Sequence, residues 1–327
     1  MTFGLKRILA VAATIVLAFG ATMARMDAQA PRDLEVLQLR PNFFMIAGAG
    51  GNISVQIGED GVIVVDAGAT PSATAVVAAI RKLSPQPIRY IIDTSADPDH
   101  VGGNETLSKA GQTLFTAPGS IGITGDFLGG VASILSAQKV LERMSAPTGR
   151  TSPYPVTAMP TETFDDPRKY MYLNGEGIEV LLQPAAHTDG DAIVFFRRSD
   201  VLVAGDVLDT NRFPVIDVAR GGSINGEIAA LNRLVDIAIP SVPIVSRDAG
   251  TLIVAGHGRI CDQYDVAEYR DMVTIVRDRV RDLKKTGMTL NQVKAASPAR
   301  GYIRRYGAES ADKFVEAVYQ SLPQEKR

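Results

Sequence analysis

Tryptophan is absent from this chain, and cysteine and histidine are scarce. The 327 residues include one cysteine, Cys261, and three histidines, His100, His187 and His257. A single cysteine cannot form an internal disulfide or a thiolate metal cluster, so any bound metal must be held by histidines and carboxylates. The three histidines are therefore the first candidates for chemistry.

A marked excess of charge of one sign is also lacking. The chain has 34 lysines and arginines against 36 aspartates and glutamates, which gives a formal net charge of −2. The sequence shows no cluster of lysines and arginines that would bind the phosphates of a nucleic acid, so we expect no nucleic-acid partner. With 46% hydrophobic and 21% charged residues, the composition excludes disordered, collagenous and coiled-coil proteins and is typical of a folded globule.

The longest hydrophobic run lies at the N-terminus. Lys6 and Arg7 precede an apolar stretch over residues 8–19. A basic start followed by such a stretch is typical of a secretory signal peptide, so we assign residues 1–30 to a signal and expect a periplasmic or secreted protein. Small residues offer more than one cleavage site. Extended through Met23, the run approaches the length that spans a bilayer, so a membrane anchor is the alternative, and a buried helix is another.

The rest of the chain, residues 31–327, is expected to form one domain. Short apolar runs alternate with amphipathic or alanine-rich runs, which predicts a layered α/β fold. The expected strands cover residues 42–46, 53–57, 61–66, 89–93, 178–183, 192–196, 201–204 and 252–255. The expected helices cover residues 71–83 and 225–239 and a C-terminal helical segment, residues 264–327.

Residues 120–171 interrupt this alternation. The stretch contains a pair of adjacent glycines and five prolines, and we expect a helical piece near residues 131–144 followed by a long loop. A loop of that length in a compact domain is usually a lid or a binding loop. Its apolar side chains could line a substrate cleft or cover the core as a separate small cluster, and both interpretations stay open.

The three histidines all lie in polar segments that directly follow expected strands. These segments are Thr94–Asn104 (TSADPDHVGGN), Ala186–Asp191 (AHTDGD), Ala204–Asp206 (AGD) and Ala255–Gly258 (AGHG). Because α/β folds place functional residues at strand ends, we expect the segments to converge on one site. Imidazole and carboxylate together suit zinc, iron or manganese.

The order of these segments resembles the metallo-β-lactamase superfamily. Asp66 ends an early strand, and the Asp-His-x-Gly-Gly loop, His187, Gly-Asp206 and Gly-His257-Gly follow it in the family's order, so the resemblance covers residues 34–290. It implies an α/β fold of four layers, an αββα sandwich, with the active site at one edge of two facing sheets. It also implies hydrolase activity.

The first loop departs from the family pattern. Family members typically carry His-x-His-x-Asp-His there, but Ser95 and Asp97 stand at the first two histidine positions, whereas Asp99 and His100 match. In the family, the two replaced histidines and the histidine matching His187 bind one metal ion. The resemblance therefore implies that this first metal site is degenerate.

The second metal site implied by the resemblance is complete. The family positions matching Asp99, His100 and His257 bind a second ion, and the carboxylate matching Asp206 bridges the two ions. We therefore expect one metal ion, zinc, with iron or manganese as alternatives. His187 is a further candidate ligand.

The expected chemistry is hydrolysis of a small-molecule substrate by a metal-activated water. Such a metal lowers the pKa of its bound water and polarises a carbonyl, and Asp97 could act as the general base beside that water. We expect Asp97 and Asp99 to be catalytic. We expect Asp66 and Ser95 to orient the metal ligands without binding the metal themselves. Amides, lactones and esters are favoured because residues 120–171 are apolar and no basic phosphate cluster is present.

Two other functions are compatible with the same residues. One is a non-catalytic protein that binds a ligand or a partner at the eroded site, because losing half of a dinuclear site removes much of its electrostatic stabilisation. The other is an iron-dependent redox enzyme, because Asp97 offers a hard oxygen ligand that favours iron. No feature of the sequence specifies the oligomeric state.

Four further features have structural interpretations. Asp189 and Asp191 are expected to hold their loop through backbone hydrogen bonds, and Asp262 is expected to cap the helix that follows it. Cys261 is expected to be a small buried core residue. Arg220–Ser223 is either a glycine turn with a surface arginine or a receiver of an anionic substrate group at a helix start.

Overall fold

The computed structural model describes residues 33–114, 130–146, 152–242 and 250–323. The expected signal segment, residues 1–30, lies outside these residues, as do parts of the expected lid segment. Within the described ranges, no helix is both long and apolar enough to cross a bilayer.

In the described part of the chain, seven strands form the first sheet, in sequence order. They are β1 (Glu35–Arg40), β2 (Phe43–Ala49), β3 (Gly51–Gly58), β4 (Gly61–Val65), β5 (Ile88–Asp93), β6 (Ser133–Ala137) and β7 (Glu162–Phe164). The strands from β1 to β4 pair antiparallel, and those from β4 to β7 pair parallel.

The second sheet, as far as the structure describes it, has six strands in the order β13-β12-β11-β10-β9-β8. They are β8 (Arg168–Leu173), β9 (Glu176–Gln183), β10 (Asp191–Phe196), β11 (Val201–Asp209), β12 (Leu252–His257) and β13 (Ile260–Cys261). All neighbours are antiparallel except β11 and β12, which run parallel.

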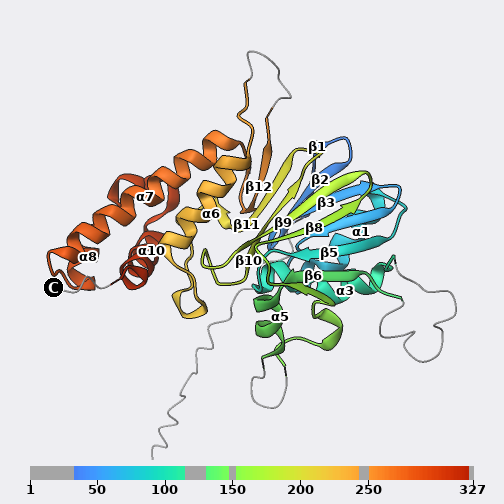
Figure 1. Ribbon diagram of the computed structural model, residues 1–327, viewed down its shortest axis with the longest axis horizontal. Coiled ribbons are helices and arrows are strands. Elements are labelled where there is room, and N and C mark those ends of the chain that lie inside the picture. The colour runs from blue at the N-terminus through green and yellow to red at the C-terminus, as the bar shows by residue number, and fades with distance from the viewer. Residues whose placement is uncertain (1–32, 115–129, 147–151, 243–249, 324–327) are drawn as a thin grey trace, which may run out of the picture. The chain divides into compact units, whose positions relative to one another are not determined.

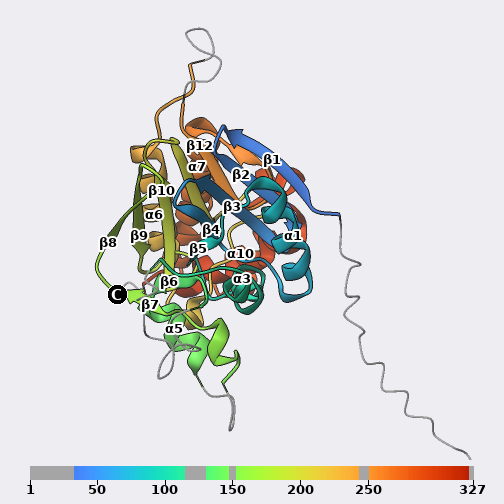
Figure 2. The same cartoon turned by 90° about the vertical axis from the view of Figure 1, so that its right-hand side faces the viewer.

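Helices flank the two sheets. They are α1 (Ala73–Leu83), α2 (Pro98–Val101), α3 (Asn104–Ala110), α5 (Gln138–Ser145), α6 (Ile224–Ile237), α7 (Gln263–Lys285), α8 (Leu290–Ala295), α9 (Ile303–Tyr306) and α10 (Ala308–Ser321). Short 3-10 helices cover η1 (Thr70–Ser72), η2 (Val156–Ala158), η3 (Val218–Arg220) and η4 (Arg300–Tyr302). Figures 1 and 2 show α1 and α3 on the side of the first sheet and α6, α7 and α10 on the side of the second.

The residues of β4 show how the layers are held together. Ile63 and Val65 belong to the buried cluster between the two sheets, whereas Val62 and Val64 pack in the cluster beneath α1. A strand that is apolar at every position is covered on both faces. This strand therefore lies between a helical layer and the opposite sheet.

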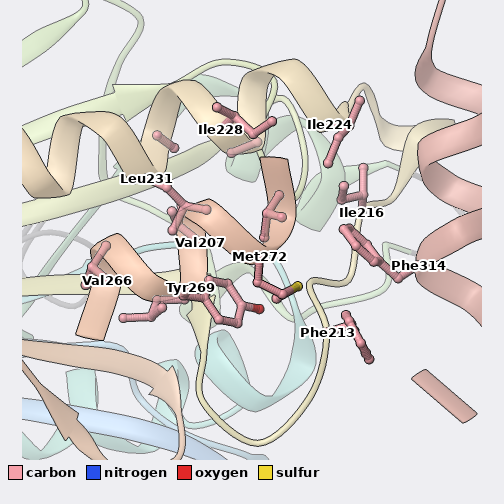
Figure 3. Close-up of a cluster of buried hydrophobic side chains, with 14 of the residues drawn as sticks. Val207, Phe213, Ile216, Ile224, Ile228, Leu231, Val266, Tyr269, Met272 and Phe314 are labelled. Carbon is pink, nitrogen blue, oxygen red and sulfur yellow. The ribbon is translucent and has the colours of Figure 1, made fainter. Parts of the chain in front are cut away.

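The outer face of the second sheet is covered by helices in the same way. Leu202 and Ala204 of β11 share a buried cluster with Leu231 of α6, Met272 of α7 and Phe314 of α10. Figure 3 shows the part of this cluster where the three helices meet. Two sheets between two helical layers confirm the predicted four-layer αββα sandwich.

Within the described residues the expected strands and helices are present, with small shifts at most ends, except for one segment that was predicted wrongly. Residues 131–144 were expected to be helical, whereas residues 133–137 form β6 and only then does α5 begin. The strand is buried and pairs with β5 and β7, so tertiary pairing overrides a weak local preference. The loop expected after it contains β7 and the start of β8. A lid formed by the rest of residues 120–171 stays a prediction, since residues 115–129 and 147–151 lie outside the described residues.

Candidate metal centre

The first loop of the site follows β5 and turns directly into α2. Pro98 occupies the first turn of this helix, and Asp97 precedes it in an extended conformation. Two glycines let the turn pack against its neighbours, because an added Cβ would lie 2.4 Å from Pro98 O at Gly102 and 2.2 Å from Ala67 O at Gly103. The Gly-Gly pair therefore determines how deeply the loop lies in the fold.

Two other glycines beside this loop were not among the predicted site residues. Gly50 has a φ of +110°, and a Cβ on it would lie 2.9 Å from the Cβ of Asp99. A Cβ on Gly51 would lie 3.3 Å from the ring of His100. The glycine-rich run before Asn52 is the sequence signal for this close approach.

His100 is fully buried and held from behind by Asp66. Its Nδ1 donates to Asp66 Oδ2 over 2.8 Å, and the backbone N–H and hydroxyl of Thr94 donate to the same carboxylate. A carboxylate behind a histidine fixes the ring and raises its basicity as a ligand. Asp66 itself has a φ of 64°, a region that aspartate adopts more readily than most residues.

The other ring nitrogen of His100 faces the interior of the site. Nε2 lies 3.2 Å from Asp206 Oδ1, yet it makes no hydrogen bond to any residue that the structure describes. A buried polar atom without a hydrogen bond is rare in a folded protein. Its position fits a nitrogen that binds a metal ion.

Asp206 and His257 come from the opposite sheet. The Nε2 atom of His257 lies 3.2 Å from Asp99 Oδ2 and 3.3 Å from Asp206 Oδ1. The amide of Asn52 in β3 donates to Ala255 O and Gly258 O, which ties the end of β12 to the first sheet. This bond between the sheets sets the position of His257.

These side chains form a first candidate ligand group. The ligand atoms of Asp99, His100 and His257 all lie within 4.8 Å of one another, and Asp206 is adjacent. Two imidazoles and two carboxylates are a donor set that suits zinc and other first-row divalent ions. The residues present therefore fit a metal ion at this position.

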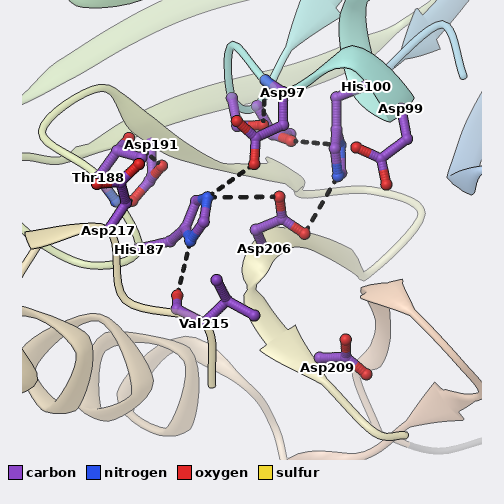
Figure 4. A network of polar contacts seen from close by, with 12 residues as sticks. Asp97, Asp99, His100, His187, Thr188, Asp191, Asp206, Asp209, Val215 and Asp217 are labelled. Atoms are coloured by element: carbon purple, nitrogen blue, oxygen red, sulfur yellow. Dashed lines mark hydrogen bonds and ion pairs between the residues drawn. The ribbon is translucent and has the colours of Figure 1, made fainter. Parts of the chain in front are cut away.

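A second group lies on the other side of Asp206. The ligand atoms of Asp97, His187 and Asp206 also lie within 4.8 Å of one another. The His187 Nε2 atom is 2.9 Å from Asp97 Oδ2 and 3.9 Å from Asp206 Oδ2, while Nδ1 donates to Val215 O over 2.6 Å. Figure 4 shows Asp206 between His100 of the first group and His187 of the second.

Ser95 belongs to neither of the two groups found among the described residues. It is buried, and its hydroxyl accepts a hydrogen bond from the backbone N–H of Asp97 over 3.2 Å. The serine therefore shapes the turn that carries Asp97.

The acidic surroundings keep the histidines charged in the metal-free protein. Burial lowers the pKa of His187, but the hydrogen bond to Asp97 and the charge of Asp206 outweigh it and raise this pKa to about 10. Burial likewise lowers the pKa of His257, and Asp206 and Asp99 raise it to about 9. A metal ion that binds here must displace these protons, so metal affinity will depend on pH.

Asp206 shows the complementary effect. Burial raises the pKa of this carboxyl, but the neighbouring His100, His257 and His187 hold it well below its usual range. The carboxylate therefore stays ionised at neutral pH. Ionised carboxylates are the form in which aspartate binds a divalent ion.

A cavity of about 240 Å³ opens onto both groups. Its wall consists of Asp97, Asp99, His187, Asp206, Asp209, Arg212, Val215 and His257. Asp209, Arg212 and Val215 were not predicted, and the polar stretch that follows Asp206 is the signal that marks them. The Nε atom of Arg212 donates a hydrogen bond to Asp209 Oδ2 over 2.5 Å.

The minor predictions near the site had mixed outcomes. Asp191 accepts hydrogen bonds from the backbone and hydroxyl of Thr188, each over 2.6 Å, so its predicted role in the loop is confirmed. Asp189 holds the loop through its backbone N–H, which donates to Arg220 O over 3.0 Å, whereas its carboxylate forms an ion pair with Arg143. The opposite charge on the adjacent helix α5 is the stronger partner.

The predictions just beyond the site are largely confirmed. Cys261 is buried, and Asp262 caps α7 through a reciprocal bond with Asp265. The stretch Arg220–Ser223 is a glycine turn whose backbone N–H groups bond within the chain, because Gly222 donates to Asp217 and Ser223 donates to Ala185. The alternative of a backbone anion site there is wrong.

By sequence, the chain matches no curated protein. Several solved structures share its fold at 15% identity, which is evidence for the fold alone. A metallo-beta-lactamase from Pontibacter korlensis superposes with a TM-score of 0.53, over 74% of this chain and 99% of that chain. The stereoselective inverting sec-alkylsulfatase Pisa1 from Pseudomonas sp. superposes with a TM-score of 0.59, over 88% of this chain. A double mutant of the sec-alkyl sulfatase PisA1 gives a TM-score of 0.64, and the present chain spans 50% of that longer chain.

The sequence also matches a family directly. Residues 47–240 match the sequence model of the Metallo-beta-lactamase superfamily, which is more than half of the chain. This range contains the first loop, His187 and Asp206. Family match, four-layer fold and the order of the histidine segments agree, and the chain belongs to the metallo-β-lactamase superfamily.

Proposed function

We propose that this protein is a hydrolase that uses one divalent metal ion, zinc, held by Asp99, His100, Asp206 and His257. The observation that carries the proposal is the meeting of two imidazoles from opposite sheets at one carboxylate. The Nε2 atoms of His100 and His257 lie 3.2 and 3.3 Å from the same oxygen of Asp206. The hydrolase-like fold of the superfamily supports the reaction class.

The protein residues have separate tasks in this proposal. Bound zinc supplies a Lewis acid and lowers the pKa of water. Asp97 lines the cavity, and its Oδ2 accepts the proton of the attacking water. His187, whose Nε2 lies 2.9 Å from that oxygen, holds the carboxylate in place. Asp66 keeps the ring of His100 oriented.

The cavity supports a small carbonyl compound as the substrate, an amide, lactone or ester. Four aspartates contribute to its wall, and its one arginine, Arg212, is already paired with Asp209, so the wall offers no free arginine or lysine to bind a phosphate group. Val215 offers an apolar contact on one side. Two of the similar structures are alkylsulfatases, so a secondary alkyl sulfate belongs in any substrate screen as a competing class.

The test has two stages. The metal content of protein purified without chelator is measured first, and turnover is then screened over generic esters, lactones, a chromogenic β-lactam and a secondary alkyl sulfate. One zinc per chain together with hydrolysis of a carbonyl substrate is the expected result. Protein that binds zinc but turns over none of these compounds would favour a ligand-binding role, and two irons would favour redox chemistry. Protein that binds no metal would refute the proposal.

We also propose that the protein is exported through its N-terminal segment. The basic residues Lys6 and Arg7 before the apolar run over residues 8–19 support this. Cell fractionation of the full chain should place it outside the cytoplasm, and deletion of residues 1–30 should retain it inside. The expected product is a periplasmic or secreted chain from which the signal segment has been removed. A full-length chain in the membrane fraction would support an anchor instead.

A further inference from the structure

Among the described residues outside the two ligand groups, Arg220 is a cation that contacts a candidate ligand directly. Arg220 Nη1 donates to Asp97 Oδ1 over 3.2 Å, while the other oxygen of Asp97 lies 2.9 Å from His187 Nε2. The carboxylate is therefore shared between a guanidinium on one side and the imidazole of the second group on the other. The arginine side chain is 51% exposed, and an exposed ion pair contributes little when its partners move freely. The backbone around Arg220 therefore decides whether the contact persists.

That backbone is fixed to the loop of His187. Asp217 N donates to His187 O over 2.8 Å, and Asp189 N donates to Arg220 O over 3.0 Å. Arg143 also donates to Arg220 O over 2.8 Å. The side chain of Asp217 accepts from Arg220 N and lies 3.4 Å from its Nε. Arg220 thus extends from an anchored turn and is oriented toward Asp97.

The two ligand groups differ in the negative charge that they have available. The first group includes Asp99 and shares Asp206, and these two carboxylates balance one divalent ion. Once Asp206 is used in this way, Asp97 is the one carboxylate that the second group has to itself. Arg220 already neutralises Asp97. A second divalent ion would then lie beside both a guanidinium and the first ion, and like charges at such distances repel strongly.

Two other carboxylates near the second group are already occupied. Asp209 lines the cavity but bonds to Arg212 over 2.5 Å. Asp191 is buried, and both of its oxygens accept hydrogen bonds from Thr188. Neither carboxylate therefore supplies the charge that a second ion needs.

We propose that Arg220 is the resident cation of the second group and that, by taking Asp97, it limits this protein to one metal ion. The inference rests on the proposed function, because it concerns the number of ions at the same centre. In this arrangement Arg220 is a positioning residue. It pairs with Oδ1 of Asp97, which is then not available to a metal ion, and leaves Oδ2 facing His187.

Metal titration of the intact protein tests this directly. Wild-type protein and variants are stripped of metal and then titrated with zinc against a chromophoric chelator, which reports stoichiometry and affinity without any substrate. Wild type and Arg220→Lys, which keeps the charge, should bind one zinc per chain. The affinity for a second zinc ion, which we expect to be weak in wild type, should be at least tenfold higher in Arg220→Ala. Arg220→Gln carries the same expectation and replaces the alanine variant if that variant does not fold.

Two controls sharpen the result. Arg197 is also exposed, at 63%, and pairs with Glu179, so Arg197→Ala removes a comparable charge away from the site and should leave both affinities unchanged. Asp97→Asn combined with Arg220→Ala should return the protein to one zinc, because the second ion needs the carboxylate of Asp97.

The possible contrary outcomes are distinct. Unchanged second-ion affinity in both uncharged variants overturns the inference, as does a wild-type protein that already binds two ions tightly. Two ions in the double variant would also overturn it, because Asp97 would then not be the group that Arg220 controls. A wild-type protein that binds no ion refutes the proposed function itself.

Discussion

His100 and His257 come from opposite sheets, yet their rings lie 5.7 Å apart in an edge-to-face arrangement. His100 follows β5 of the first sheet, and His257 ends β12 of the second. The amide of Asn52 joins the two sheets beside them, through the backbone on either side of His257. The site therefore depends on how the sheets are packed together, and this dependence gives the predictions below.

Removing His257 should abolish tight metal binding while leaving the fold intact. His257 lies at the rim of the site and supplies one of its two unshared imidazoles. We expect His257→Ala to weaken zinc binding by more than about 100-fold. Residues that only hydrogen-bond to a metal ligand already change metal affinity by about 10- to 100-fold, and a ligand itself should contribute more. Zinc titration measures this, and the melting temperature in excess chelator should stay close to that of wild type. Undiminished zinc affinity would exclude His257 as a ligand.

Asp66 should act on metal binding through His100. Asp66→Asn keeps the shape of the side chain, and asparagine tolerates the positive φ at this position. The substitution removes the negative charge behind Nδ1, so zinc affinity should fall by about 10- to 100-fold. Asp60→Asn, an exposed aspartate in the turn before β4, is the matched control and should leave zinc affinity unchanged. Equal affinities in the two variants would argue against the role of Asp66.

The metal-free protein should lose stability as the pH rises above neutrality. The pKa values of His187 and His257 are raised from 6.5 to about 10 and about 9 in the folded state. A raised pKa means that the protonated histidine favours folding, so its contribution is complete below about pH 6.5 and is lost as the pH passes 9 and 10. Melting temperatures in chelator between pH 6 and pH 10.5 measure this decline. The decline should be shallower in His257→Gln, and an identical slope would contradict the assignment.

The glycine pair of the first loop should tolerate no side chain. A Cβ on Gly103 would lie 2.2 Å from the carbonyl oxygen of Ala67, and backbone cannot move aside as a flexible side chain can. We expect Gly103→Ala to lower the free energy of unfolding by about 1–3 kcal/mol. Gly130→Ala is the control, because an added Cβ there meets no atom within 4 Å. Denaturant unfolding of both variants gives the comparison, and equal stabilities would contradict the packing described here.

Local sequence patterns were sufficient to predict most of the strands and helices. The apolar run of β4 and the end of β5 at Asp93 are visible because hydrophobic periodicity is a property of neighbouring residues. β6 was missed, because its burial between β5 and β7 depends on strands that lie far away in the sequence. The glycines at positions 50 and 51 were missed for the same reason, since only their contact with the Asp99–His100 turn makes them necessary.

The sequence by itself determined which residues are candidate ligands, because residue type and spacing restrict them to three histidines and their neighbouring acids. Only the tertiary structure decided how these ligands divide. It placed Asp97 between His187 and Arg220, residues that follow it by 90 and 123 positions. The physical reason is that an ion pair depends on distance in space, and the packing of two sheets, rather than the order of residues, sets that distance.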